Sequence, residues 1–164
     1  MRLDLLFSPW RLEYVTSSKS ERGCVFCEEP RQEDTDSLVV FHGIRCYVIL
    51  NRYPYNNGHL MVAPYRHVSA LGALAPDELH EIASLTQRSE AVLGEAYGPE
   101  GLNVGINLGK TAGAGIVDHL HVHLVPRWLG DTNFMTVVGS ARVLPEDLAS
   151  SARRLRPIFE RLGK

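Results

Sequence analysis

The sequence predicts an α+β fold, in which an antiparallel sheet of about five strands packs against a central helix and a C-terminal helix. Short apolar segments separated by Gly, Pro and Asn residues are typical of strands joined by turns. Two longer segments repeat their apolar residues at intervals of three and four, as amphipathic helices do. No internal repeat or change in composition divides the chain, so we expect a single domain over residues 1–164.

Composition limits the classes of function. The chain has 164 residues, of which 45% are hydrophobic, and this is sufficient for one well-packed core. A formal net charge of -2 argues against a nucleic-acid-binding protein, since such proteins normally display a basic stripe. The segment from Met1 to Trp10 is interrupted by Asp4 and Pro9, and no later apolar run reaches membrane-spanning length. We therefore expect a cytoplasmic protein that binds no membrane.

The first half of the chain contains apolar segments separated by turn residues. Gly43 can adopt the positive φ that a tight turn needs, and Pro64 cannot donate to a sheet, so it ends a strand. Residues 28–37 are polar and are expected to form a solvated connector. We predict, in order, an N-terminal arm over 1–37, strands over 38–41 and 44–50 joined at His42-Gly43, a loop over 51–58 and a strand over 59–63.

The second half of the chain contains the two predicted helices. From Pro76 the apolar residues recur near helical spacing, Pro76 suits the first turn, and Gly98-Pro99 ends the helix. Residues 145–163 show the same repeat and form an amphipathic C-terminal helix. Between the helices we expect a strand over 102–107, a loop of small residues over 109–115 and a strand that carries the histidines of residues 119–123.

Three of the seven histidines, His119, His121 and His123, alternate with large apolar residues. Because side chains on a strand alternate between its faces, the three imidazoles share one face. Imidazole titrates near neutrality, so such a row supplies nucleophilic nitrogens, proton donors and metal ligands. Same-face neighbours lie roughly 6.6 Å apart along a strand, which disfavours one metal site for all three and favours separate roles. The alternative is a polar strand face that is rich in histidine.

Two of the three cysteines form the pair Cys24-Val25-Phe26-Cys27. In a reducing compartment this spacing favours a metal site or a redox-active pair over a structural disulfide. Two thiolates fit a tetrahedral zinc site that needs two further ligands. The alternative is a pair of buried thiols, and a small buried side chain is also our interpretation of Cys46. Candidates for the two missing ligands are His42, His59, His67, His80 and the three alternating histidines.

The loop over 107–115 contains Gly109-Lys110-Thr111, which is part of a phosphate-loop pattern. It lacks the glycine five residues before Gly109, where Val104 stands, and it precedes a strand instead of a helix. It is therefore not a phosphate loop of that type. Its small residues still allow backbone N–H groups to approach an anion closely, and the alternative is a plain flexible turn.

The segment His119-Leu120-His121-Val122-His123-Leu124-Val125 resembles the signature of the histidine triad (HIT) superfamily. Asn51-Arg52-Tyr53-Pro54 and Gly58-His59-Leu60-Met61-Val62 are similar to an upstream motif of that family, and the resemblance runs from about Pro9 to Leu144. Similarity to the branch of bacterial diadenosine tetraphosphate (Ap4A) phosphorylases and ATP adenylyltransferase-like members lies in Pro9-Trp10-Arg11, Asn107-Leu108-Gly109, Ala112-Gly113-Ala114-Gly115, Val125-Pro126-Arg127-Trp128 and Gly130-Asp131-Thr132-Asn133-Phe134-Met135.

The resemblance implies a HIT-like fold and a role for each site residue. His121 would be the nucleophile that attacks the α-phosphorus of a nucleotide and forms a nucleotidyl-histidine intermediate. His123 would hydrogen-bond the phosphoryl oxygens or the leaving group, with His59 as a second contact. The other implied contacts are the backbone N–H groups of Gly115 and Ile116 for the phosphate, Asn51 for ribose hydroxyls, Asn107 for the phosphate or leaving group, and Phe41 and Ile44 for the base.

The resemblance also implies a structural zinc ion. Zinc-bearing members of the family complete their site with a histidine about forty residues after the cysteine pair and with the first triad histidine. In this sequence the ligands would be Cys24, Cys27, His67 and His119. A closed set of four ligands leaves no position for a catalytic water molecule.

The implied activity is nucleotidyl transfer, with inorganic phosphate accepting the nucleotidyl group so that Ap4A yields ATP and ADP. Hydrolysis of dinucleoside polyphosphates or nucleoside phosphoramidates is the alternative, with water in place of phosphate. A zinc-stabilised nucleotide-binding module without turnover is a third interpretation. Ala114-Gly115-Ile116 departs from the commoner Gly-Gln-Ser or Gly-Gln-Thr of the family. The glutamine and hydroxyl that contact the leaving group in hydrolase branches are therefore absent.

The segment over 128–144, after the triad, is longer than a simple connection requires. We expect it to help select a dinucleotide over a mononucleotide, through Asp131, Asn133 and Phe134. The alternative is an edge strand that packs against a second subunit, since family members are commonly dimers. We thus expect an adenine nucleotide and inorganic phosphate as small-molecule partners, and a homodimer or a higher homo-oligomer.

Overall fold

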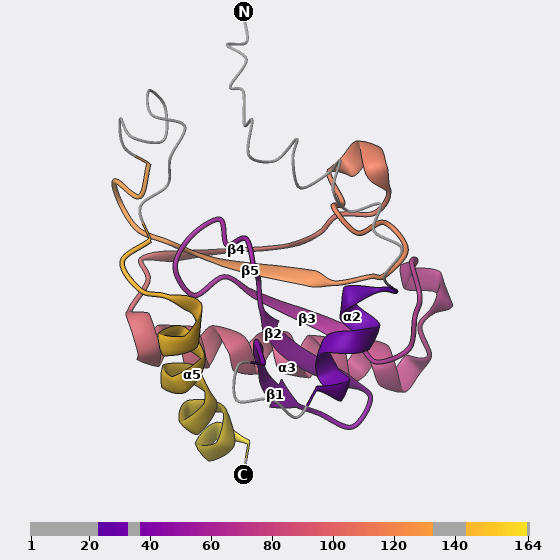
Figure 1. Ribbon diagram of the computed structural model, residues 1–164, viewed down its shortest axis with the longest axis horizontal. Helices are drawn as coiled ribbons and strands as arrows, with labels where there is room; N and C mark the ends of the chain where they lie inside the picture. The colour runs from indigo at the N-terminus through magenta and orange to yellow at the C-terminus, as the bar shows by residue number, and fades with distance from the viewer. Residues whose placement is uncertain (1–22, 33–36, 133–143, 164) are drawn as a thin grey trace, which may run out of the picture.

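The computed structural model describes residues 23–32, 37–132 and 144–163. Within them, five antiparallel strands form one sheet in the order β1-β2-β3-β5-β4 (Figure 1). The elements are α2 (Val25–Glu28), η1 (Glu29–Arg31), β1 (Val39–His42), β2 (Cys46–Leu50), β3 (Leu60–Pro64), η2 (Leu71–Ala73), α3 (Pro76–Tyr97), β4 (Gly101–Ile106), η3 (Lys110–Ala112), β5 (Val122–Arg127) and α5 (Leu148–Leu162).

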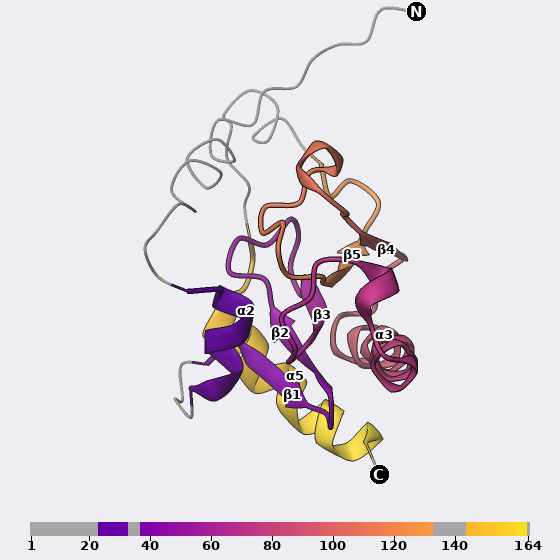
Figure 2. The same cartoon turned by 90° about the vertical axis from the view of Figure 1, so that its right-hand side faces the viewer.

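Helices α2 and α3 lie on opposite sides of the sheet (Figure 2), and α5 packs against α3 and β1. Two neighbouring residues of β2 contact the opposite layers. Cys46 Sγ lies 3.7 Å from the backbone oxygen of Glu78 in α3, whereas the Tyr47 hydroxyl donates to the backbone oxygen of Phe26 in α2 at 2.7 Å. This is the alternation that a strand imposes. The arrangement confirms the predicted α+β fold. No helix among the described residues has the length and apolarity needed to cross a bilayer.

The turn between β1 and β2 is longer than the sequence predicted, because a carboxylate from α3 binds it. Glu81 accepts hydrogen bonds from the backbone N–H groups of Ile44 at 2.7 Å, Arg45 at 2.6 Å and Cys46 at 3.1 Å. Consequently β2 begins at Cys46 and not at Ile44. A Cβ atom at Gly43 would lie 2.5 Å from Glu81 Oε1, so the turn requires glycine there.

A register irregularity in β1 determines which face of the sheet Phe41 occupies. Val39 pairs with Ile49, and regular antiparallel pairing would then set Phe41 opposite Tyr47. Phe41 instead pairs with Val48, one residue further along β2. Because a shift of one residue moves a side chain to the other face, Phe41 faces the layer of α3 and α5.

The ends of α3 agree with the sequence prediction. Pro76 lies in its first turn, where a missing N–H costs no helical hydrogen bond. The N–H of Ala75 donates to the Glu78 carboxylate at 2.7 Å and satisfies a backbone donor that the helix cannot. Gly98 ends the helix with φ of 54°, a left-handed conformation that glycine adopts without strain.

The C-terminal helix begins three residues later than Pro145. Asp147 is its N-cap, and Oδ1 of Asp147 accepts the backbone N–H of Ser150 at 2.8 Å. The first helical residue is therefore Leu148. The buried side chains Ala152, Leu155 and Phe159 repeat at helical spacing, as predicted.

The predicted connector over 28–37 is partly structured where it is described. Glu29 is buried and its Oε1 accepts a hydrogen bond from Arg52 Nη2 at 2.7 Å, which joins η1 to the loop before β3. A charged residue this deeply buried needs a partner, and Arg52 supplies it. The remaining connector residues, 33–36, lie outside the described residues.

Candidate active site and metal centre

The pairing of β3 with β5 brings together two histidines from separate motifs. Met61 of β3 pairs with His123 of β5, and His59, two residues before Met61, therefore faces the same side of the sheet. His59 Nε2 lies 3.0 Å from His123 Nδ1, which is hydrogen-bond distance. The sequence predicted both residues as phosphate contacts, and the structure joins them directly.

A backbone group determines which nitrogen of each ring carries the proton. The N–H of Tyr55 donates to His59 Nδ1 at 3.1 Å, so this nitrogen is unprotonated. Neutral His59 then carries its proton on Nε2 and donates to Nδ1 of His123, which in turn carries its own proton on Nε2. Burial, with smaller contributions from His123 and His121, lowers the pKa of His59 to about 3. His59 is therefore neutral at neutral pH.

The backbone oxygen of His119 fixes the tautomer of His121. His121 lies just before β5, which begins at Val122, so the regular strand is shorter than predicted. His121 Nδ1 donates to the backbone oxygen of His119 at 2.8 Å, which leaves the lone pair on Nε2. Burial lowers the pKa of His121, so the neutral form predominates at neutral pH. The ring of Phe26 stacks on it with 4.5 Å between centroids.

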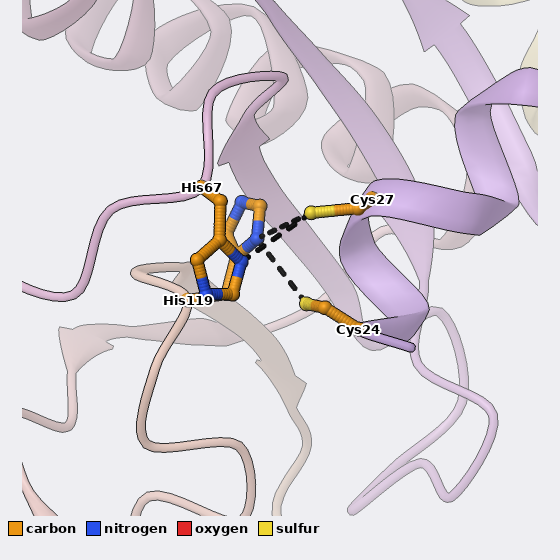
Figure 3. Close-up of side chains that lie close together, drawn as sticks. All are labelled: Cys24, Cys27, His67 and His119. Carbon is orange, nitrogen blue, oxygen red and sulfur yellow. Dashed lines mark hydrogen bonds between the residues drawn. The ribbon is translucent and has the colours of Figure 1, made fainter. Parts of the chain in front are cut away.

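His119 takes a different role. Its Nε2 donates to the backbone oxygen of Pro64 at 2.9 Å, so Nδ1 is unprotonated and faces two thiols. His119 Nδ1 lies 3.4 Å from Cys24 Sγ and 3.5 Å from Cys27 Sγ, and His67 Nδ1 lies 3.4 Å from Cys27 Sγ. Figure 3 shows these four side chains converging, with Cys27 on α2 and Cys24 at its N-cap. All four ligand atoms lie within 4.8 Å of one another.

These distances suit a tetrahedral zinc ion. With Zn–S bonds of about 2.3 Å and Zn–N bonds of about 2.1 Å, neighbouring sulfur and nitrogen ligands are about 3.6 Å apart. The nitrogen-to-sulfur distances of 3.4 and 3.5 Å are close to that value. Burial raises the pKa of the Cys24 thiol, an effect that a divalent cation opposes because it stabilises the thiolate. The chemistry and the spacing of the four ligands therefore fit the predicted zinc site.

A pocket of about 320 Å³ opens beside His123. Gly105 of β4 pairs with His123, and no atom lies within 4 Å of the position that a Cβ on Gly105 would occupy. Because Gly105 has no side chain, this position of β4 leaves the space beside His123 open. It is lined by the predicted residues His123 and Asn107, and by Tyr55, Asn103, Val104, Gly105, Val125 and Arg127.

Several residues of the site were not predicted from the sequence. Strand alternation could have identified Arg127, which follows His123 by four residues and shares its face, and Asn103 could have been found on the facing side of β4. Tyr55 acts through its backbone N–H, which no side-chain motif reports. Phe26 lies between the two cysteines, but only the folded chain brings it to the histidines.

Asn51 contacts one of the histidines, and Gly115 and Ile116 precede the triad in the chain. Asn51 Nδ2 is 3.4 Å from His59 Nδ1, and Asn51 Oδ1 accepts the N–H of Tyr53 at 2.9 Å. Gly115 and Ile116 are half-buried in the loop that leads into the triad. Their contacts with ribose and phosphate stay predictions.

The structure does not bring Phe41 and Ile44 to the histidines. Phe41 stacks on Phe159 of α5 with 5.6 Å between centroids, and the Arg88 guanidinium lies 4.8 Å from its ring. Ile44 is 90% exposed in the turn that Glu81 binds. The register irregularity in β1 and the helix-bound turn therefore correct the base-pocket prediction, because neither side chain lines the face that carries the histidines.

Two segments singled out in the sequence lie outside the described residues. Pro9-Trp10-Arg11 belongs to residues 1–22, and Asn133 and Phe134 belong to residues 133–143. The proposed role of the segment over 128–144 in dinucleotide selection stays a prediction.

Comparison with known proteins agrees with this geometry. A model of the HIT domain matches residues 32–128. A Mycobacterium tuberculosis protein named AP-4-A phosphorylase is 42% identical over 162 residues, which cover 94% of this chain and 83% of that protein.

Solved structures show the same fold. A zinc-bound histidine triad family protein from Mycobacterium smegmatis is 28% identical with a TM-score of 0.68, over 86% of this chain and 96% of that one. A hypothetical histidine triad nucleotide-binding protein from Sulfolobus tokodaii is also 28% identical, with a TM-score of 0.69 over 85% of this chain and 93% of that one. The match to the HIT domain spans more than half of the chain and includes the histidines described above, so this protein belongs to the HIT domain family and is one of its enzymes.

Proposed function

We propose that this enzyme cleaves Ap4A by phosphorolysis, through a covalent adenylyl group on His121. The observation that carries the proposal is the orientation of His121, whose Nδ1 is bonded to a backbone oxygen at 2.8 Å so that Nε2 offers a lone pair. The ring of His123 lies 4.8 Å away, centroid to centroid, and carries a proton on Nε2. A nucleophile and a hydrogen-bond donor are thus neighbours, as displacement at phosphorus requires.

In the first step, His121 Nε2 attacks the α-phosphorus of Ap4A. A P–N bond forms and the bond from that phosphorus to the bridging oxygen breaks, so ATP leaves. His123 Nε2–H hydrogen-bonds the leaving oxygen and offsets its developing negative charge. His59 holds His123 in the donor tautomer throughout.

In the second step, an oxygen of inorganic phosphate attacks the adenylyl phosphorus. The P–N bond breaks, its electron pair returns to His121 Nε2, and ADP is released. Water in place of phosphate would give AMP by the same route, so the acceptor alone separates phosphorolysis from hydrolysis. The relative named AP-4-A phosphorylase supports phosphate as the acceptor.

Several groups are proposed to bind the dinucleotide. The pocket beside His123 contains Asn107 and suits the polyphosphate or the leaving nucleotide. Backbone N–H groups of Gly115 and Ile116 would bind the α-phosphate, and Asn51, next to His59, would contact ribose. A homodimer or a higher homo-oligomer stays a prediction.

We also propose that zinc, bound by Cys24, Cys27, His67 and His119, is structural. The four ligands close the coordination sphere, so the ion would stabilise the packing of α2 against the histidine segment without contacting the substrate.

Product analysis tests the proposed function. We expect Ap4A and phosphate to yield ATP and ADP, with radioactive phosphate appearing in ADP. Chromatography of reactions with and without phosphate distinguishes the acceptors. AMP and ATP as the products in both reactions would show a hydrolase and contradict phosphorolysis.

His121→Asn should abolish turnover, because it removes the nucleophilic nitrogen and keeps a similar shape. We expect kcat to fall by at least about 10³-fold while nucleotide binding, measured by calorimetry, persists. The P–N bond of an adenylyl-histidine is labile to acid, so the reactions are quenched at neutral pH. Mass spectrometry should then reveal one adenylyl group on the wild type and none on the variant. His80→Asn, at an exposed histidine on α3, is the matched control and should keep both activity and adduct. Near-normal activity of His121→Asn would refute the mechanism.

The pKa of His59 makes stability depend on pH. This pKa is about 3 in the folded protein and about 6.5 in the unfolded chain, so the unfolded state binds the extra proton and the free energy of unfolding falls as pH falls below 6.5. Between pH 7 and pH 5 the loss attributable to His59 is about 2 kcal/mol. In urea titrations of chelator-treated protein, the free energy of unfolding should therefore fall between pH 7 and pH 5 by about 2 kcal/mol more in the wild type than in His59→Gln, which keeps the smaller effects of the other buried histidines. If the free energy of unfolding depended equally on pH in the two proteins, the role given to His59 would be contradicted.

Removal of zinc should destabilise the protein. With free zinc at about a thousand times its Kd, binding adds about 4 kcal/mol to the free energy of unfolding. We expect a chelator to lower the Tm of the wild type. The Tm of Cys24→Ser should not change on chelation, because that variant has already lost a ligand. Cys46→Ala should keep zinc and chelator sensitivity, since Cys46 is buried with its Sγ against the backbone of Glu78 in α3. Metal analysis that finds no zinc in the purified wild type would overturn the site.

A further inference from the structure

A buried amide joins the loop before β3 to the end of β5. Asn56 is 8% exposed, and its Nδ2 donates to the backbone oxygen of Pro126 at 3.0 Å and to Asp131 Oδ2 at 2.9 Å. The backbone oxygen of Asn56 accepts the N–H of His59 at 3.2 Å. Asn56 therefore links the C-terminal end of β5 to the turn that precedes His59.

Asp131 is held as an acceptor by the residue that ends β5. Its Oδ2 accepts from Arg127 Nε at 2.6 Å and its Oδ1 from Arg127 Nη2 at 3.0 Å. Arg127 Nη1 donates to Asn103 Oδ1 on β4 at 2.8 Å. Hydrogen bonding to Arg127 lowers the pKa of Asp131 to about 2, so the carboxylate stays ionised at neutral pH. All three nitrogens of this guanidinium thus donate within the protein, which favours a structural role over anion binding.

We propose that Asn56 and Asp131 are positioning residues, which set the orientation and tautomer of His59 and, through it, of His123. Tyr55 directly precedes Asn56, so the bonds of Asn56 hold in place the N–H that donates to His59 Nδ1 at 3.1 Å. The other donor to this nitrogen, Asn51 Nδ2, is more distant at 3.4 Å. If the Tyr55 N–H moves away, only this longer contact opposes protonation of His59 Nδ1, so Nδ1 can take the proton and Nε2 becomes an acceptor. His123 Nδ1 then becomes the donor, and Nε2 of His123 loses its proton.

The consequence for catalysis rests on the proposed function, in which His123 Nε2–H stabilises the leaving oxygen. The consequence for the tautomers does not, because it concerns the protein without substrate. A test in two parts can therefore separate a failure of the positioning role from a failure of the proposed activity.

The first part measures tautomers. In ¹⁵N-histidine-labelled protein at neutral pH, proton-nitrogen correlation spectra distinguish Nδ1–H from Nε2–H rings. We expect the wild type to show Nε2–H for His59 and His123 and Nδ1–H for His121. Asn56→Ala should produce mixed tautomers at His59 and His123 and leave the His121 signal unchanged.

The second part measures kinetics with Ap4A and phosphate. Asn56→Ala should lower kcat by about tenfold to a hundredfold, with a much smaller change in KM, because a misplaced donor affects the transition state more than substrate binding. Asp131→Asn removes the charge and keeps the shape, and should cause a smaller change of the same kind. It also serves as the second variant if Asn56→Ala fails to fold.

Glu146→Gln is the matched control. The Arg154–Glu146 pair is 2.8 Å long with side chains 51% and 15% exposed, against 46% and 9% for the Arg127–Asp131 pair. It joins α5 to α3 through Tyr97 and should leave tautomers and kcat unchanged. The proposal is overturned if Asn56→Ala and Asp131→Asn keep wild-type tautomers, or if their kcat falls only as the folded fraction falls. Altered tautomers in a protein whose wild type does not cleave Ap4A would support the positioning role and refute the proposed function.

Discussion

The antiparallel register between β3 and β5 is the constraint on which the site depends. It sets Met61 opposite His123, so that His59 reaches the same face as His123. The segment that precedes β5 continues beside the end of β3, where Pro64 offers its backbone oxygen to His119. A slip of one residue would move these side chains to opposite faces of the sheet and separate all of these partners at once. The buried apolar face of both strands prevents such a slip.

Backbone groups, and not charged side chains, decide the protonation pattern of the histidines. The N–H of Tyr55 sets the tautomer of His59, and the backbone oxygens of His119 and Pro64 set those of His121 and His119. Burial lowers the pKa of each of these three rings, so they are neutral without an acidic partner. The sheet that positions the rings therefore also determines which nitrogen donates and which accepts.

The proposed metal ligands and the proposed nucleophile share a neighbour. Cys24, at the N-cap of α2, and Cys27, within it, face His119, and between them Phe26 stacks on His121. Packing of this short helix thus affects both centres. Zinc bound at the proposed site would stabilise the face that covers the nucleophile, although the ion would remain outside the reaction itself.

Local patterns in the sequence were sufficient for the order and type of the five strands and the two long helices, because period and turn propensity act over a few neighbouring residues. Pro76 and Gly98 marked the ends of α3, for example. Phe41 was misassigned because the irregularity in β1 depends on pairing with β2, and the role of Arg127 required the facing strand. The Tyr55 N–H at His59 likewise depends on contacts across the sheet. Only the tertiary structure decides such features, because strand register and long-range hydrogen bonds arise from the packing of the whole sheet.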